Sequence, residues 1–359
     1  MNKKVPPIYF YLPKSLCSET ELPQNPEFHW QWLVDRGNKN VGNYAWTLLT
    51  YLYLRANDFP CHFTNTIPSE GICLSHRSLL PDNLKPNSNL LIIALQADRG
   101  RHPYAQLHVV QNRLQQVSRD SFTFWKSFYL PHWVQPGLIP RNQDRGELLE
   151  NVAFFGYKSN LISQLDRPLW ENTLKELGIR WQIIDPLHWN DYSEVDAVVA
   201  IRKFGYNWDH TWKPATKLHN AWLAGVPAIL GCESAYRAER RNELDYIEVN
   251  SYKALVSAIK NLRENKELRR AMFENSKLRS EEVKPQKTVE QWQNFLLNIA
   301  IPAYQNWHTA SESSRQRFLK IRSLTYPVYF YQRQLKFFRA KVVAKTTKKK
   351  FVGQDRRYL

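Results

Sequence analysis

The most informative stretch of the sequence is Lys213-Pro-Ala-Thr-Lys-Leu-His-Asn-Ala-Trp-Leu-Ala-Gly-Val-Pro-Ala-Ile-Leu230. Leu218, Trp222 and Gly225 follow the i, i+4, i+7 spacing of a helix face that packs on a sheet. A glycine suits the end of that helix, and the proline two residues later prevents its continuation. The run Pro-Ala-Ile-Leu at 227–230 predicts a strand buried on both faces, which is typical of a parallel sheet.

The residues directly after this strand, Gly231–Tyr236, are expected at the carboxyl edge of the sheet. Ligands of open α/β sheets bind at that edge. Lys217 and Asn220 lie on another flank of the preceding helix, one turn apart. The stretch therefore predicts a ligand site as well as a fold.

The size and composition of the chain fit two folded domains. A chain of 359 residues matches about two domains of roughly 150 residues each. Hydrophobic residues at 43% and charged residues at 23% are ordinary values for a globular protein. The longest apolar run, Leu90–Leu95, is far shorter than the roughly 20 residues that cross a bilayer, and the N-terminus lacks a signal-peptide core. A cytoplasmic location is therefore expected.

The four cysteines show neither a CxxC motif nor a Cys/His spacing, and they lie far apart, at Cys17, Cys61, Cys73 and Cys232. This pattern favours reduced thiols, with neither a disulfide framework nor a zinc site.

The net charge of +17 is concentrated at the C-terminal end. Residues 315–359 hold 14 Lys or Arg and one acid and so carry +13, which leaves +4 for residues 1–314. Aromatic and basic residues are interleaved over residues 326–359. This pattern suits an anionic membrane surface, where each nearby cation contributes about 1 kcal/mol. A solvated or interdomain tail is the alternative, and nucleic acid is not expected because no reading module accompanies the charge.

Strands and helices alternate along the chain, which predicts parallel sheets with right-handed crossovers. A segment rich in turn residues at 135–146 is the best candidate for an interdomain linker. A late helical segment near 289–307, interrupted by Pro302, would cross back towards the first domain. The elements before the linker are strands near 8–12, 61–64, 72–75, 90–95 and 108–111 and a helix near 44–56. Those after it are strands near 152–155, 181–184, 197–201, 228–230 and 246–249, and helices near 167–177, around Leu218, from 252 and from 267.

The fold class that follows is α/β, with two Rossmann-like, doubly wound domains that face a cleft and a C-terminal helical basic tail. We expect the first domain over residues 1–146, the second over 147–300, and the crossing helix with the tail over 301–359.

Positive side chains follow two strands of the predicted second sheet. Gly156 and Lys158 come after its first strand, and Arg202 and Lys203 come after its third. Together with Lys217 these cations would neutralise paired phosphates, while the N-terminus of the helix that carries Lys217 adds backbone donors and a favourable dipole. A diphosphate site is expected here, and solvated strand-end charges are the alternative.

Three further side chains belong to the predicted donor site. Asn220 is expected to hydrogen-bond ribose or phosphate, and Glu233 to accept hydrogen bonds from ribose or sugar hydroxyls. Tyr236 is placed to stack on a base, with packing in the core as the alternative.

These residues carry a resemblance to a known family. The pattern from Lys213 to Leu230, continued by Glu233-Ser-Ala-Tyr-Arg237 and Leu244-Asp-Tyr-Ile-Glu-Val249, resembles the donor domain of bacterial GT-B fold glycosyltransferases (family 1/4-like) over roughly Val152–Arg279. The resemblance implies that the second domain holds a nucleotide-sugar and the first an acceptor, and that the final helix crosses back. Bacterial surface polysaccharide synthesis, with a glycan, lipid-linked or small-molecule hydroxyl as acceptor, is the setting that it implies.

The chain departs from the family in one respect. Many retaining members have two glutamates with seven residues between them, and the corresponding positions here are Trp212 and Asn220, so retaining chemistry is not assigned. The chain also lacks an Asp-x-Asp pair of the kind that holds a divalent metal. Neither a metal nor another cofactor is therefore expected.

An inverting reaction needs a base from the first domain to deprotonate the acceptor hydroxyl. Asp98, after the buried strand at 90–95, is the leading candidate, and a turn aspartate before Gly100 is the alternative. Asp35 and His76 are weaker candidates.

The sequence thus predicts a metal-independent, hexosyltransferase-like glycosyltransferase. A nucleotide-sugar epimerase on the same fold, or a non-catalytic membrane- or nucleic-acid-associated scaffold, are the alternatives.

Overall fold

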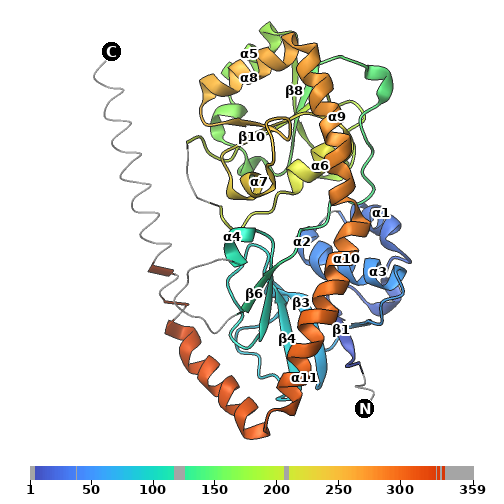
Figure 1. Ribbon diagram of the computed structural model, residues 1–359, viewed down its shortest axis with the longest axis vertical. Coiled ribbons are helices and arrows are strands. Elements are labelled where there is room, and N and C mark those ends of the chain that lie inside the picture. Colours follow the sequence, from blue (N-terminus) through green and yellow to red (C-terminus); the bar gives the residue numbers. More distant parts are fainter. Residues whose placement is uncertain are drawn as a thin grey trace.

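The computed structural model describes residues 5–37, 39–116, 126–205, 210–328, 330–331 and 334–335. Two α/β lobes follow one another along the long axis of the molecule, and helices from the C-terminal third run beside both (Figure 1).

The first lobe is built on a parallel sheet of six strands in the order β2-β1-β3-β4-β5-β6. Every residue of β3 and β4 is buried, because central strands of a parallel sheet are covered on both faces. The strands are β1 (Ile8–Tyr11), β2 (His62–Thr64), β3 (Gly71–His76), β4 (Leu90–Leu95), β5 (Leu107–Val110) and β6 (Lys126–Tyr129).

The second lobe has a parallel sheet of five strands in the order β11-β10-β9-β7-β8. Its central strands β7, β9 and β10 are entirely buried. The strands are β7 (Asn151–Phe155), β8 (Arg180–Ile184), β9 (Ala197–Ala200), β10 (Ala228–Gly231) and β11 (Ile247–Val249).

Helices cover the two sheets and connect them. In the first lobe they are α1 (His29–Asp35), α2 (Val41–Asn43), the π-helical η3 (Tyr44–Leu48), α3 (Leu49–Ala56) and α4 (Arg113–Gln116). In the second lobe they are α5 (Pro168–Glu176), α6 (Thr216–Ala224), α7 (Ser234–Glu239), α8 (Tyr252–Glu264) and α9 (Lys266–Val283). The C-terminal ones are α10 (Pro285–Phe295), the π-helical η9 (Leu296–Ala300), α11 (Ile301–Thr309) and a helix over residues 312–328.

Helix α6 is the helix predicted from the opening stretch. Leu218, Ala221 and Trp222 are buried in the core of the second lobe. Gly225 ends the helix in the left-handed conformation, with a φ of 70°, and its N–H reaches the carbonyls of Ala221 and Trp222. The strand β10 follows directly, as the run at 227–230 predicts.

The helical run α10-η9-α11 crosses from the second lobe back onto the first (Figure 1). Val289, Trp292 and Phe295 of α10 lie in the core of the first lobe together with Leu48 of η3. Residues 285–300 thus pack on the first lobe. Pro302 does not interrupt the helix, because the wider π-turn of η9 directly precedes it.

The two doubly wound lobes and the returning helix make a GT-B-like architecture, as the sequence predicts. Strand β6 was not predicted. The predicted tail over 326–359 lies almost wholly outside the described residues; of it, 326–328, 330–331 and 334–335 are described.

Candidate functional site

The strand order of each sheet reverses at one point, and such switch points are where α/β sheets bind ligands. In the second sheet the reversal lies between β7 and β9. Gly156 follows β7 and Arg202 follows β9, so both flank it. In the first sheet the reversal lies between β1 and β3, and His76 is the last residue of β3.

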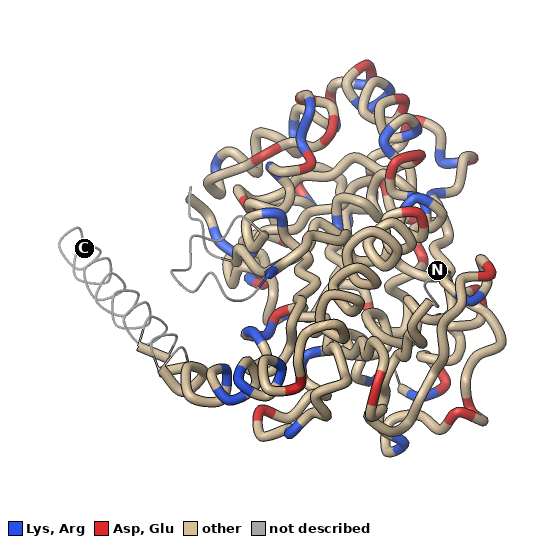
Figure 2. Tube along the Cα trace, turned by 60° about the horizontal axis from the view of Figure 1, so that its bottom comes forward, with Lys and Arg blue, Asp and Glu red and all other residues tan. Residues whose placement is uncertain are grey.

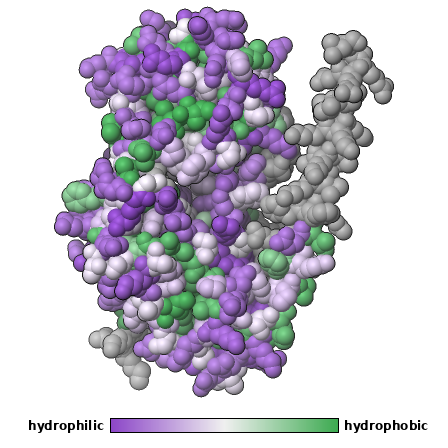
Figure 3. Space-filling view, turned by 180° about the vertical axis from the view of Figure 1, so that it is seen from behind, coloured by the Kyte–Doolittle hydropathy of each residue, from purple (hydrophilic) through white to green (hydrophobic). Residues whose placement is uncertain are grey.

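Side chains of the two lobes meet between these edges. Asp98, after β4, forms an ion pair with Lys213, which precedes α6. Gln111 Nε2 donates hydrogen bonds both to Asp98 Oδ1 and to the carbonyl oxygen of Trp212, at 2.8 Å each. We call the place around Asp98, Lys213, Lys217 and the Arg202–Glu233 pair the interdomain site. Figure 3 shows the molecular surface hollowed near the middle, between the two lobes.

The backbone that presents Asp98 is strained. Ala97, which is buried, has a φ of 46°. The left-handed region costs an L-residue with a Cβ roughly 1–2 kcal/mol, and strain of this kind clusters at functional sites. The conformation turns the chain sharply after β4 and directs Asp98 to the second lobe. The side chain remains 44% exposed, so it is accessible from solvent.

Lys217, on the first turn of α6, is half-buried and faces Gly156. Its Nζ lies 5.4 Å from the centre of the Phe154 ring, and a Cβ on Gly156 would come within 3.3 Å of it. It makes no hydrogen bond or ion pair with any described residue. Burial, followed by the nearby charge of Arg202, lowers the pKa of Lys217 from 10.5 to about 7. Among the residues described, this ammonium group therefore has no ion-pair partner at the switch point of the second sheet.

Arg202 and Glu233 form a buried ion pair beside Lys217. Their side chains are 11% and 8% exposed. Arg202 Nε and Glu233 Oε1 have no hydrogen-bond partner within the described part of the chain. A buried pair of this kind usually satisfies all its polar atoms, and an orphaned donor or acceptor marks a place for water or a ligand group.

Two residues of the predicted donor site lie in the core. Asn220 is buried, and its Oδ1 accepts a hydrogen bond of 2.9 Å from the backbone N–H of Gln135. This hydrogen bond holds the segment between the lobes. Tyr236 is fully buried, with its ring centre 6.2 Å from that of Tyr246. It presents no ring face on which a base could stack.

Three other predicted residues lie at the surface. Lys158 is exposed and pairs with Asp166 at 2.7 Å, so its charge already has a partner. Lys203 is exposed after β9, and its backbone carbonyl lies beside Gly231. Asp35 lies on the exposed side of α1, where it accepts a hydrogen bond of 2.7 Å from Gln31.

His76 lies at the switch point of the first sheet, with its Nδ1 2.7 Å from Ser78 Oγ. Burial, with the charge of Arg99, lowers the pKa of His76 to about 4, although Asp98 acts in the opposite direction. His76 is only 6% exposed, whereas the Asp98 side chain is 44% exposed and reaches Lys213 of the second lobe. Asp98 is therefore the more accessible candidate for a base.

Sequence reasoning did not single out Lys213, Gln111 or Asn112. Asn112 Nδ2 donates to the Lys213 carbonyl and to Ser234 Oγ at 3.0 Å each, which links the lobes a second time. Gln111 and Asn112 directly follow β5, so the strand-end rule that selected Arg202 would also have selected them.

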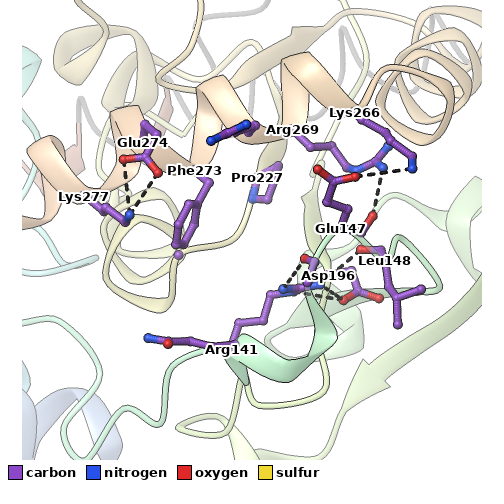
Figure 4. Close-up of a pocket in the computed structure, with 14 residues that line it drawn as sticks. Arg141, Glu147, Leu148, Asp196, Pro227, Lys266, Arg269, Phe273, Glu274 and Lys277 are labelled. Carbon is purple, nitrogen blue, oxygen red and sulfur yellow. Dashed lines mark hydrogen bonds and ion pairs between the residues drawn. The ribbon is translucent and has the colours of Figure 1, made fainter.

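A separate hollow of about 390 Å³ opens at the opposite, amino edge of the second sheet (Figure 4). Its charged side chains are largely paired with one another: Arg141 with Asp196 at 2.8 Å and Lys277 with Glu274 at 2.9 Å. We place the candidate site at the carboxyl edge, because Lys217 is half-buried there and forms no ion pair with any described residue.

No group of three or more His, Cys, Asp or Glu side chains in the described part of the chain is arranged to hold a metal ion. None of the described helices combines the length and the apolar character needed to cross a membrane.

No protein-family model matches the sequence, and a comparison with curated proteins finds no match either. The fold is similar to those of solved GT-B glycosyltransferases. Sucrose-phosphate synthase of Thermosynechococcus elongatus matches with 13% identity and a TM-score of 0.44, over 65% of this chain and 74% of its own. S. aureus TarM, in complex with UDP, matches with 12% identity and a TM-score of 0.48, over 69% of this chain. The present chain spans only 58% of that TarM chain. Anabaena HepE, in complex with UDP, matches with 11% identity and a TM-score of 0.45, over 81% of this chain and all of HepE.

Proposed function

We propose that the protein is a glycosyltransferase that moves a sugar from a nucleotide-sugar onto a hydroxyl group. The observation that carries the proposal is Lys217, a half-buried cation at the switch point of the second sheet that forms no ion pair with any described residue. A diphosphate supplies the missing negative charge. Asp98 of the other lobe faces the same place, so a donor held by Lys217 would present its sugar to a carboxylate.

Each residue then has a distinct task. Lys217 binds the diphosphate and stabilises the charge that develops as the sugar departs. Arg202 Nε and Glu233 Oε1 offer one donor and one acceptor to the nucleoside or the sugar. When Lys213 leaves its ion pair with Asp98 and binds the phosphates, Asp98 is free to remove the proton from the acceptor hydroxyl. We propose that these fixed cations bind the diphosphate and stabilise its charge without a metal or another cofactor.

We further propose that the acceptor is a glycan or a lipid-linked hydroxyl, and that the enzyme acts in bacterial surface polysaccharide synthesis in the cytoplasm, at the inner face of the membrane. The basic C-terminal segment supports this setting, because cations attract a protein to anionic lipid.

Calorimetric titration with uridine, guanosine and adenosine diphosphates tests the donor site. One of them should bind, and Lys217→Ala should weaken it by about tenfold to a hundredfold, the effect of losing a charge-assisted hydrogen bond. Lys175→Ala, on the exposed face of α5, is the matched control and should leave affinity unchanged. Equal affinity in Lys217→Ala and the native protein would remove the diphosphate role.

The reaction itself is tested by Asp98→Asn with the donor thus identified. Transfer should fall by about 10²–10⁴-fold, because a general base is lost, while nucleotide affinity is retained. Turnover of the donor to an epimer in the absence of any acceptor would instead indicate an epimerase.

A further inference from the structure

The helix over residues 312–328 carries an apolar stripe on its outer face. Ile321, Leu324 and Val328 are 42%, 67% and 52% exposed. The same 3-4 spacing continues to Tyr331 and Leu335, which lie in helical positions and are 69% and 44% exposed. Five large apolar side chains at this spacing lie along one side of a helix. In Figure 3 hydrophobic side chains are visible at the lower right, beside the grey segment.

The opposite face of this helix is fixed to the first lobe. Arg315 Nη2 donates to Asn89 Oδ1 at 3.0 Å, and Arg77 Nη2 donates to the Tyr326 hydroxyl at 3.2 Å. Leu319 is buried between these contacts along the helix. The helix is therefore docked, and its exposed stripe belongs to the outer surface of the first lobe.

The charge beside the stripe is positive. Arg317 and Lys320 are exposed on the same helix, whose only acid is Glu312 at its first turn, whereas Arg315 and Arg322 are buried. Figure 2 shows Lys or Arg positions along the helix that leads into the grey trace. A second copy packed on the stripe would bring like charges together, which disfavours pairing of two helices. An anionic lipid surface instead satisfies both the apolar stripe and the cations.

We propose that the outer face of helix 312–328, continued by Tyr331 and Leu335, is the surface by which the protein docks on an anionic membrane. The apolar side chains enter the headgroup boundary, and Arg317 and Lys320 contact lipid phosphates. The first lobe, which carries Asp98, is thereby held at the bilayer. Membrane docking itself requires neither the nucleotide-sugar donor nor sugar transfer. Only the idea that docking brings the protein to a lipid-linked acceptor rests on the proposed function.

Co-sedimentation of the full-length protein with vesicles of phosphatidylcholine, with and without phosphatidylglycerol, tests the proposal. Binding should require phosphatidylglycerol and weaken at high salt. Leu324→Glu should reduce the partition coefficient by at least about tenfold, because it removes apolar burial and adds repulsion. The double variant Arg317→Glu, Lys320→Glu should reduce the partition coefficient by about fivefold or more for each charge reversed.

Matched controls come from exposed helices of the second lobe. Leu278→Glu on α9, where the leucine is 72% exposed, and the pair Lys253→Glu and Lys260→Glu on α8 should bind vesicles like the native protein. Equal loss in these controls, or unchanged binding in Leu324→Glu, would overturn the proposal. Two other results would also overturn the proposal. The first is a dimer, detected by light scattering, that dissociates in Leu324→Glu. The second is binding to DNA that is abolished both by Leu324→Glu and by added vesicles. Because nucleotide affinity is measured separately, failure here leaves the proposed reaction intact.

Discussion

At the scale of single residues, the interdomain site depends on a charge without a partner and on a strained turn. Arg202 and Lys213 are each paired with a carboxylate, whereas Lys217 forms no ion pair with any residue that the structure describes and lies beside the Phe154 ring. Burial and the charge of Arg202 lower the pKa of Lys217 because they disfavour its charged form. An arriving diphosphate reverses this balance, since it favours the charged form.

Lys217 should therefore make nucleotide binding dependent on pH. Above pH 7 the free lysine is neutral, so binding must take up a proton, and affinity should fall by up to roughly tenfold per pH unit. Lys217→Arg stays charged and should remove this dependence. Calorimetry between pH 6 and 9 in buffers of different ionisation enthalpy measures both quantities. A flat profile for the native protein would contradict the assignment.

The same depressed pKa affects stability in the absence of ligand. Between about pH 7 and pH 10.5, Lys217 is protonated in the unfolded chain but largely neutral in the folded one. The unfolded chain therefore binds more protons, and the free energy of unfolding rises with pH across this range. Below pH 7 its destabilising effect is fully present.

Ala97→Gly should not destabilise the protein, although Ala→Gly usually does. Glycine relieves the left-handed strain of roughly 1 kcal/mol, which offsets its larger unfolded-state entropy. Ala94→Gly, in the buried strand β4, is the control and should cost about 1 kcal/mol in urea unfolding. Loss of transfer activity in Ala97→Gly without loss of stability would show that the rigid turn positions Asp98.

At the scale of elements, the crossing run α10-η9-α11 ties the end of the second lobe to the core of the first. Trp292 is completely buried, and its ring centre lies 6.3 Å from that of Trp46 in η3. Two π-turns, η3 and η9, therefore occur in helices that pack in the same core. The run fixes where the second lobe sits, because it continues without a break from the Lys284 cap of α10.

Trp292→Ala should lower the free energy of unfolding of the first lobe by about 3–5 kcal/mol, the usual effect of removing a buried aromatic side chain. Leu297→Ala in η9, where the leucine is 51% exposed, should change it by less than about 0.5 kcal/mol. Urea unfolding followed by tryptophan fluorescence measures both; similar values for the two variants would place Trp292 outside the core.

At the scale of the whole molecule, polar contacts hold the two lobes in register. Asn112 reaches the Lys213 carbonyl and Ser234 Oγ, and Tyr129 donates from its hydroxyl to Glu239 Oε1 at 3.1 Å. Arg113 adds an ion pair to the same glutamate at 3.6 Å. Each lobe has a core of its own, so these contacts govern the angle between lobes more than their folding.

Asn112→Ala should consequently open the molecule without unfolding it. We expect a larger radius of gyration by small-angle X-ray scattering, and compaction on addition of the nucleotide that binds. Asn57→Ala removes a hydrogen bond to the Tyr53 carbonyl within one lobe and should leave the radius unchanged. An unaltered radius in Asn112→Ala would show that the helical run alone sets the angle.

The sequence by itself determined most of the strands, the helix α6 that ends at Gly225, and the carboxyl edge of the second sheet as the place of Arg202 and Lys217. Runs such as Leu90–Leu95 and Ala228–Gly231 have only one favourable environment, a sheet covered on both faces. Strand β6, Lys126-Ser-Phe-Tyr129, escaped prediction because an edge strand is partly exposed and lacks that apolar signature.

Only the tertiary structure decided which polar residues line the interdomain site. Asn220 and Lys217 are one turn apart on α6, but they lie on different sides of the helix. Asn220 contacts Gln135 of the linker, and Lys217 lies beside Gly156. The Asp98–Lys213 pair joins residues 115 positions apart, and no local pattern encodes such a contact. Local sequence fixes periodicity and burial, whereas side-chain direction and the approach of two lobes depend on how distant surfaces pack.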